Sequence, residues 1–143
     1  MGINHLLDCV YAEAAMLAAP YWLWKLPQAR RYRAGLLQRL GGAPRLEPET
    51  PRLWVHAASV GEAGIPRTLI EQFRSANPDW DVAFSTFTDT GADRLRDLYP
   101  DCTVFYWPLD FTWSVAAALD RVKPTAVMLV EQELWPNFLS ACG

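Results

Sequence analysis

Four short apolar runs alternate with segments of helical length over residues 51–143, and this alternation restricts the possible folds more than any other feature of the chain. Most of the runs are β-branched or aromatic, which is typical of buried strands. Strands that alternate with helices predict βαβ units, a parallel sheet and right-handed crossovers. We therefore predict a Rossmann-like α/β fold. The expected strands are 53–57, 82–87, 103–106 and 126–130, and the expected helices are 63–75, 91–98 and 113–122.

The usual strand order of such a fold, 3-2-1-4, predicts where a ligand would bind. This order makes the first and fourth strands neighbours, with a crevice outside their carboxyl ends. Glu62 follows the first strand and Glu131 ends the fourth. If the order holds, two carboxylates flank one crevice, which suits acid–base chemistry on a hydroxyl nucleophile. Glu62 is explained about equally well as a first-turn acid that complements a helix dipole.

Small residues and hydroxyls surround these two carboxylates in the expected fold. Small residues at a strand-to-helix turn let a ligand approach the backbone, and hydroxyls with free N–H groups hold a sugar or a phosphate. The alternative for the hydroxyl-rich turn after the second strand is an ordinary Ser/Thr helix cap. His56, within the first strand, is interpreted as a buried hydrogen-bonded residue. The candidate substrate-binding residues are Ser59, Gly61, Thr88, Thr90, Gly91 and Trp135.

Charge and cysteine content narrow the function classes. Residues 51–143 hold twelve acidic and seven basic side chains, which argues against nucleic acid as the main partner. The three cysteines are widely spaced, without the paired spacing of a zinc site. We therefore expect buried free thiols and no metal.

The N-terminal segment, residues 1–50, is interpreted as a membrane-associated helix with a linker. Residues 14–24 are uncharged, and Tyr21, Trp22 and Trp24 lie just before a stretch that is basic up to residue 45. The run is too short to span a bilayer, but aromatic residues followed by positive charge favour docking on an anionic membrane surface. The alternative is a core helix that packs on the domain. Leu36 to Gly42 predicts a helix end with a glycine cap.

Residues 51–143 form the second expected unit, a Rossmann-like acceptor-side domain. Pro136 suits the first turn of a helix that has barely begun when the sequence stops. A four-stranded open sheet ending here would leave one edge bare. We therefore expect this domain to be truncated.

Five segments, taken together, resemble the N-terminal part of the 3-deoxy-D-manno-octulosonic acid (Kdo) transferases. The two most specific read Trp-Val-His-Ala-Ala-Ser-Val-Gly-Glu and Glu-Gln-Glu-Leu-Trp-Pro-Asn. The segments are 32–33 with 38–41, 54–62, 86–91, 107–110 and 131–137.

The resemblance implies the N-terminal half of a GT-B glycosyltransferase, whose two Rossmann-like domains face each other across a cleft. It implies transfer of Kdo from CMP-Kdo to a lipid A precursor in lipopolysaccharide biosynthesis, at the cytoplasmic face of the inner membrane. The implied roles are general base for Glu62 and transition-state stabiliser for Glu131. No cofactor is implied, and the donor CMP-Kdo would be held mainly by a C-terminal domain that this sequence lacks. The fragment alone is therefore expected to be inactive.

Two positions depart from the family pattern, and one other function remains open. Gln38 stands where the family usually has Glu, and Asp93 stands where a Glu is common. Both differences concern local packing or acceptor fit. The alternative function is a non-catalytic, membrane-docked Rossmann-like binding module or remnant. Against a nucleotide-binding module, no Gly-x-Gly-x-x-Gly or P-loop lysine motif follows any expected strand.

Overall fold

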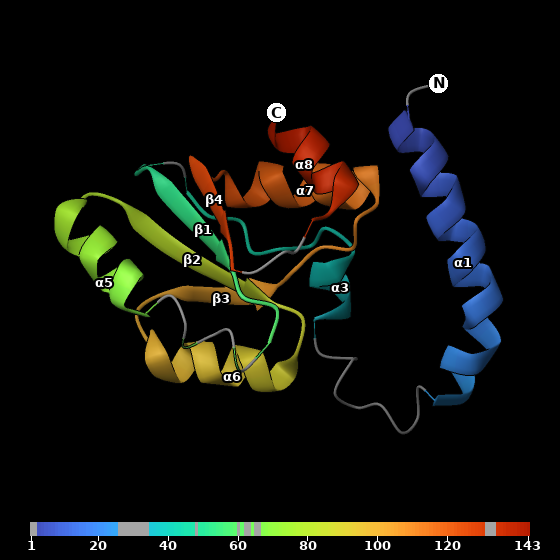
Figure 1. The fold of residues 1–143 in the computed structure, drawn as a ribbon, viewed down its shortest axis with the longest axis horizontal. Coiled ribbons are helices and arrows are strands. Elements are labelled where there is room, and N and C mark those ends of the chain that lie inside the picture. The colour runs from blue at the N-terminus through green and yellow to red at the C-terminus, as the bar shows by residue number, and fades with distance from the viewer. Residues whose placement is uncertain are drawn as a thin grey trace.

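The computed structural model describes residues 3–25, 35–47, 49–59, 61, 64, 67–130 and 134–143. Helices cover both faces of a four-stranded parallel sheet, and one long helix stands beside it (Figure 1). The predicted Rossmann-like α/β fold is confirmed. The strands are β1 (Arg52–His56), β2 (Asp81–Thr86), β3 (Thr103–Tyr106) and β4 (Ala126–Leu129). The helices are α1 (Ile3–Lys25), α3 (Leu36–Arg39), α5 (Arg67–Ala76), α6 (Asp89–Leu98), α7 (Thr112–Val122) and α8 (Pro136–Cys142).

The strand order is β3-β2-β1-β4, as predicted, and every pairing is parallel. Trp54 in β1 is in register with Ala83 on one side and Val127 on the other. Strand β1 is therefore central and buried along its whole length. The connection from β3 through α7 to β4 passes over two strands, β2 and β1, so β4 lies beside β1 and the carboxyl ends of β1 and β4 are neighbours.

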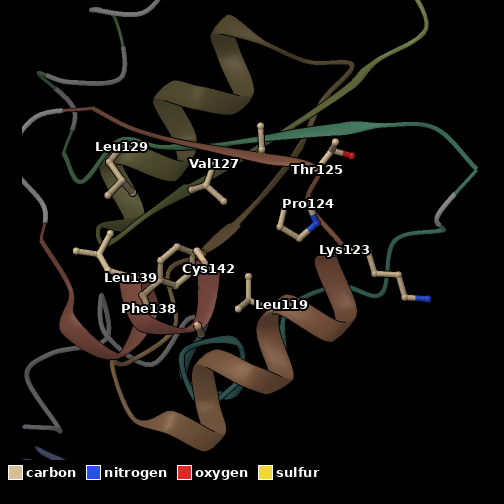
Figure 2. Close-up of a pocket in the computed structure, with 11 residues that line it drawn as sticks. Leu119, Lys123, Pro124, Thr125, Val127, Leu129, Phe138, Leu139 and Cys142 are labelled. Atoms are coloured by element: carbon tan, nitrogen blue, oxygen red, sulfur yellow. The ribbon is translucent and has the colours of Figure 1, made fainter. Parts of the chain in front are cut away.

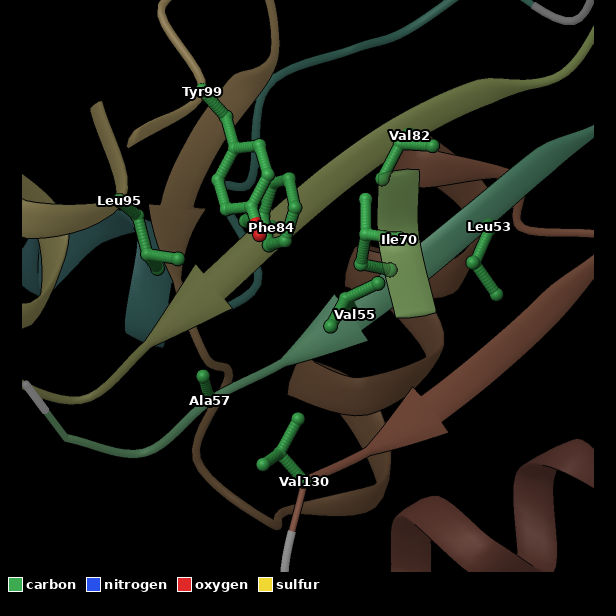
Figure 3. Packing of buried hydrophobic residues seen from close by; sticks show 9 residues of the cluster. All are labelled: Leu53, Val55, Ala57, Ile70, Val82, Phe84, Leu95, Tyr99 and Val130. Atoms are coloured by element: carbon green, nitrogen blue, oxygen red, sulfur yellow. The ribbon is translucent and has the colours of Figure 1, made fainter. Parts of the chain in front are cut away.

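One face of the sheet is mainly aliphatic and is covered by α5 and α6 (Figure 3). Because side chains alternate along a strand, Leu53 and Val55 of β1 and Ala57 just after it all belong to this face. Ile70 from α5 and Leu95 from α6 pack against them. Ile70 of α5 is fully buried, whereas its neighbour Leu69 is 52% exposed.

The opposite face is rich in aromatic rings and is covered by α7 and α8. Trp54 is its centre, with ring centroids 5.2 Å from Phe105, 5.2 Å from Trp107 and 5.3 Å from Phe138. Each ring buries a large apolar area, and the tilted and edge-on contacts suit their quadrupoles. Trp54 Nε1 donates to Ser85 Oγ at 2.7 Å, which satisfies the one polar atom of the indole.

The helix boundaries differ from the sequence expectations by a few residues. Helix α6 begins at Asp89 and α7 at Thr112, two residues and one residue before their expected starts. Helix α5 is described from Arg67 onward. Pro136 occupies the first turn of α8, as predicted.

Helix α1 contacts the body through its amino-terminal half, beside α7 and α8, while the rest stands away from the sheet (Figure 1). Pro20 lies within the helix without ending it. Much of its apolar surface is exposed; the side chain of Leu17, for example, is 84% exposed. Among the described helices, none has the length and hydrophobicity needed to cross a bilayer.

Residues 35–47 lie against the body between α1 and β1. Gly41 adopts a φ of 86° after α3, as expected for a glycine cap. Ala43 is buried in the aromatic cluster, and Leu46 N–H donates to the Arg121 carbonyl at 2.9 Å. A domain boundary near residue 50 stays a prediction.

All three cysteines are free thiols. The expectation that they are buried is wrong, because Cys9 and Cys142 are exposed and Cys102 is half-buried. Cys9 lies on α1 and Cys142 is the last residue of α8.

Candidate functional site

The carboxyl ends of β1, β2 and β4 meet at one edge of the sheet. Beyond β1, the Ala58 carbonyl accepts from the Phe87 N–H at 3.3 Å and from the Thr86 hydroxyl at 3.2 Å. On the other side of β1, Val130 N–H donates to the His56 carbonyl at 2.9 Å. The segments that follow these three strands are thus adjacent, as the predicted strand order requires.

The two carboxylates predicted to do chemistry, Glu62 and Glu131, lie outside the described residues. Their roles therefore stay predictions. Of their described neighbours, Ser59 is half-buried and Gly61 is exposed. Among the described residues, a Cβ atom added to Gly61 would have only Ser59 Oγ, at 3.9 Å, within 4 Å. Gly61 is consequently not required by crowding within this part of the chain.

The hydroxyl-rich turn after β2 is a helix cap. Thr88 is the N-cap residue of α6, and its Oγ1 accepts from the Gly91 N–H at 3.0 Å. The Thr90 hydroxyl donates to Thr88 Oγ1 at 3.4 Å and is exposed. This geometry is that of the alternative interpretation, the ordinary Ser/Thr cap. It leaves ligand binding by Thr88, Thr90 and Gly91 as an untested prediction.

Gly91 is also required by close packing. A Cβ atom at this position would lie 2.4 Å from Thr86 Oγ1 and 2.8 Å from Thr88 Oγ1. The glycine thus lets the start of α6 approach the end of β2. The same close approach aligns the cap with the carboxyl edge of the sheet.

Trp135 packs on the aromatic face of the sheet, near the carboxyl ends of β1 and β2. Its ring centroid is 5.5 Å from that of Phe87, which in turn meets His56 edge-on at 5.1 Å. The His56 ring also lies 4.0 Å from Trp107. These contacts place the described part of the segment after β4 against the segment after β2.

His56 is a buried, hydrogen-bonded residue, as predicted. Its Nδ1 lies 3.2 Å from the Ser85 carbonyl and 3.0 Å from Ser85 Oγ. A carbonyl only accepts, so the contact favours a proton on Nδ1. Burial lowers the pKa of His56 to about 3, and the imidazole is therefore neutral at physiological pH. Nothing in this environment suits it to act as a base on a solvent-exposed substrate.

Arg39 also contributes to this edge of the sheet. It is only 8% exposed, and its Nη2 donates to the Phe87 carbonyl. Its guanidinium also lies 4.8 Å from the centroid of the Tyr106 ring. Arg39 therefore stabilises the turn after β2 through its hydrogen bond to the Phe87 carbonyl.

Gln38, one of the two departures from the family pattern, has a clear structural role. Its Oε1 accepts from the Tyr106 N–H at 2.9 Å, at the end of β3. An amide oxygen accepts here as a carboxylate oxygen could, so the substitution preserves this contact. The Tyr106 hydroxyl donates to Asp89 at 2.6 Å; burial, followed by Asp89, raises the pKa of Tyr106 to about 12. Asp93 is exposed and pairs with Arg96 at 3.2 Å.

A separate groove of about 530 Å³ runs between the β4 edge, α7 and α8 (Figure 2). Leu119, Val127 and Phe138 give it an apolar lining. None of the described residues predicted for the site lines this groove. Within the described ranges, no cluster of three or more His, Cys, Asp or Glu side chains could hold a metal ion.

A protein-family model described as 3-deoxy-D-manno-octulosonic-acid transferase (kdotransferase) matches residues 34–143. A 3-deoxy-D-manno-octulosonic acid transferase of Haemophilus influenzae is 34% identical, over 76% of this chain and 26% of that protein. The protein of the same name from Chlamydia pneumoniae is 28% identical, over 96% and 33%. A probable mitochondrial transferase of this name from Arabidopsis thaliana is 27% identical, over 74% and 24%. The chain thus spans about a quarter to a third of the length of these curated relatives.

Proposed function

The chain belongs to the 3-deoxy-D-manno-octulosonic acid transferase family, and on this premise we propose that it is the acceptor-side part of a glycosyltransferase of lipopolysaccharide biosynthesis. The donor is CMP-Kdo and the acceptor is a sugar hydroxyl on a lipid A precursor. Glu62 is the general base, and Glu131 stabilises the transition state. The donor's nucleotide is held mainly by a second Rossmann-like domain of a GT-B fold.

The meeting of the segments after β1, β2 and β4 carries this proposal. Val130, hydrogen-bonded through its N–H to His56 O at 2.9 Å, directly precedes Glu131 in the sequence. Ser59 and Gly61 directly follow the same end of β1 and precede Glu62. Ligands of open α/β sheets bind outside the carboxyl ends of strands at such a switch point.

The chemistry follows from what a carboxylate does beside a hydroxyl. Glu62 takes the proton of the acceptor hydroxyl as its oxygen forms a bond to the anomeric carbon of Kdo. The bond between that carbon and the phosphate oxygen breaks, and CMP leaves with the electron pair. A positioned base contributes about 10²–10⁴-fold to such a rate. Neutral, buried His56 takes no part in this proton transfer.

Helix α1 supports a membrane-bound acceptor. Its polar side chains Asn4, Asp8 and Tyr11 make hydrogen bonds to the body. Its apolar side chains face outward, and those of Met16 and Leu17 are 68% and 84% exposed. Such an apolar outer face suits contact with lipid, and the basic residues that follow α1 in the sequence suit anionic headgroups. The proposed location is the cytoplasmic face of the inner membrane.

The base is tested in the full-length protein that carries this chain. Glu62→Gln keeps the shape of the side chain and removes its basicity, so Kdo transfer to a lipid A precursor should fall at least about 100-fold. Binding of CMP-Kdo, measured by calorimetry, should stay unchanged. The matched control is Glu71→Gln on α5, where the exposed carboxylate pairs only with Arg67 among the described contacts.

Near-normal turnover by Glu62→Gln would show that the base lies elsewhere. Absence of transfer in the wild-type protein with CMP-Kdo and lipid A precursor would favour the alternative, a non-catalytic membrane-docked binding module. The 143-residue chain alone should neither bind the CMP nucleotide nor transfer Kdo. Saturable micromolar binding of the nucleotide by this chain would contradict donor binding by a second domain.

The membrane contact is tested with vesicles that contain phosphatidylglycerol. Leu17→Asp adds a charge to the outward face of α1 and should weaken vesicle binding in a flotation assay at least about tenfold, because an aspartate is costly to bring into lipid. Wild-type binding should also fall with added salt. The matched control is Leu69→Asp on α5, whose side chain is likewise exposed. Equal binding by both variants would contradict docking through α1.

A further inference from the structure

Helices α7 and α8 have no side-chain cap from their own N-cap residues. Helix α7 starts after Phe111 and α8 after Trp135, and neither residue makes a side-chain hydrogen bond to its helix. The first N–H groups of any helix have no partner within the helix. Because the α8 start is buried, these groups need acceptors from elsewhere in the fold.

Helix α7 receives its acceptor from α1, about a hundred residues earlier in the chain. Asp8 Oδ1 accepts from the Thr112 N–H at 2.9 Å, and Asp8 Oδ2 accepts from the Thr112 hydroxyl. A carboxylate at a helix start also complements the helix dipole. Asp8 therefore acts as the N-terminal cap of α7, supplied by a different helix.

Helix α8 receives its acceptors from Asp110, which is buried. The Asp110 carboxylate accepts from the Asn137 N–H at 3.0 Å and from the Phe138 N–H at 2.9 Å. The Tyr11 hydroxyl of α1 donates to the same carboxylate at 3.3 Å. Burial, followed by the negative charge of Asp110, raises the pKa of Tyr11, which keeps this hydroxyl protonated as a donor.

The side chain of Asn137 joins these two caps. Its Nδ2 donates to Asp8 Oδ1 at 3.1 Å and to the Asp110 carbonyl at 2.5 Å, and the residue is only 2% exposed. These five residues define the three-helix junction: Asp8, Tyr11, Asp110, Thr112 and Asn137.

The three-helix junction lies between α1 and the candidate site. Asn137 is two residues beyond Trp135, whose ring packs on Phe87 at the end of β2. Glu131 lies a few residues earlier in the same segment of the sequence. The hydrogen bonds of Asn137 therefore fix the position of the residues at the start of α8, and with them the position of Trp135.

We propose that Asp8 is a positioning residue, which by capping α7 and binding Asn137 couples the placement of α1 on a bilayer to the start of α8 and to Trp135. The link to lipid and to catalysis rests on the proposed function; the link between α1 and α8 rests on the hydrogen bonds alone. Docking of α1 on lipid reduces the motion of the three-helix junction. The start of α8 is then more rigid and keeps Trp135 in place beside the acceptor.

The coupling is measured by hydrogen exchange, read by mass spectrometry on peptides that cover 109–115 and 134–143. Asp8→Ala should speed exchange at the first turns of α7 and α8 about tenfold, the change expected for the loss of a helix cap. Asp8→Asn keeps one oxygen acceptor and should restore part of the protection. The matched control is Glu13→Ala, an exposed acid on the same helix, which should change neither peptide.

Vesicles with phosphatidylglycerol test whether docking of α1 on lipid affects the starts of α7 and α8. In the wild-type chain they should slow exchange in both peptides, and in Asp8→Ala they should leave both unchanged. Because no transfer is assayed, failure of the proposed enzyme activity would leave this result standing. Likewise, failure of this exchange experiment would leave the proposed enzyme activity standing.

Three outcomes would overturn the proposal. One is faster exchange spread evenly over β1 and β2, which indicates only a lower global stability. Another is an effect of Asp8→Ala no larger than that of Glu13→Ala. The last is equal protection by vesicles in Asp8→Ala and in the wild type. If Asp8→Ala does not fold, Tyr11→Phe removes a single hydrogen bond of the junction and is judged by the same criteria.

Discussion

The two faces of the sheet are built from different chemistry. The face under α5 and α6 is mainly aliphatic, and Leu53 and Val55 pack there against helices of the regular βαβ pattern. The face under α7 and α8 is aromatic around Trp54, and polar atoms are buried with it. Among the described residues, buried His56 Nε2, Trp107 Nε1 and Asn137 Oδ1 have no hydrogen-bond partner.

The difference shows where structure and candidate function meet. The aliphatic face encloses a core and needs only volume and patterning. The aromatic face connects the ends of β1, β2 and β4 through His56, Phe87 and Trp135. It is also where α1 joins the body, close to Asp110 and Asn137. Substitutions on the aromatic face should therefore cost more and affect the site more.

Removal of the central indole should have the largest effect. Trp54→Ala removes the ring that contacts Phe105, Trp107 and Phe138, and we expect the free energy of unfolding to fall by about 3–5 kcal/mol. Val55→Ala, the next residue in β1 and buried on the other face, should cost less because fewer atoms are removed. Urea denaturation measures both. An equal or larger loss of unfolding free energy in Val55→Ala would contradict the greater sensitivity of the aromatic face.

Acid should act on the aromatic face through His56. Its folded-state pKa of about 3 lies below the ordinary 6.5, so the unfolded chain binds the proton first. The stability that a neutral His56 contributes is complete above pH 6.5. It is lost as the pH falls from 6.5 toward 3, by about 1.4 kcal/mol per pH unit.

His56→Phe should lower the slope of unfolding free energy against pH by that amount between pH 6 and 4, in urea titrations. Phe87→Leu is the matched control, because it removes a ring in contact with His56 and keeps the imidazole. An unchanged slope in His56→Phe would mean that His56 is protonated in the folded state as readily as in the unfolded one.

The aliphatic side should be sensitive at one point, where α6 meets β2. Gly91→Ala places a Cβ atom 2.4 Å from Thr86 Oγ1, so we expect a loss of about 1–3 kcal/mol even though alanine favours helices. Gly64→Ala is the control, since no atom of the described residues lies within 4 Å of the added Cβ atom. Thermal unfolding compares the two. A stabilising Gly91→Ala would show that the start of α6 can move away without cost.

The periodic and local features of this protein were determined by its sequence. Strand 103–106 has the predicted bounds, alternating strands and helices predict a parallel sheet, and β3-β2-β1-β4 is the usual strand order of such a fold. The glycine cap at Gly41 and the helix start at Pro136 were also predictable. The strand bounds, the glycine cap and the helix start depend on neighbours a few residues apart, whose backbone preferences act in any context. The adjacency of the carboxyl ends of β1 and β4, which precede Glu62 and Glu131 in the sequence, was predictable from the usual strand order of the fold.

Only the tertiary structure decided which distant polar groups find one another. Asp8 in an apolar helix reads as an interruption, yet it caps a helix about a hundred residues away. Asp110 and Asn137 belong to motifs of the family, but their mutual hydrogen bonds follow from the placement of α8 on the sheet. Such pairs depend on distances set by packing of the whole domain, because a buried N–H must be satisfied by whichever acceptor the fold brings near. Sequence spacing carries no record of that distance.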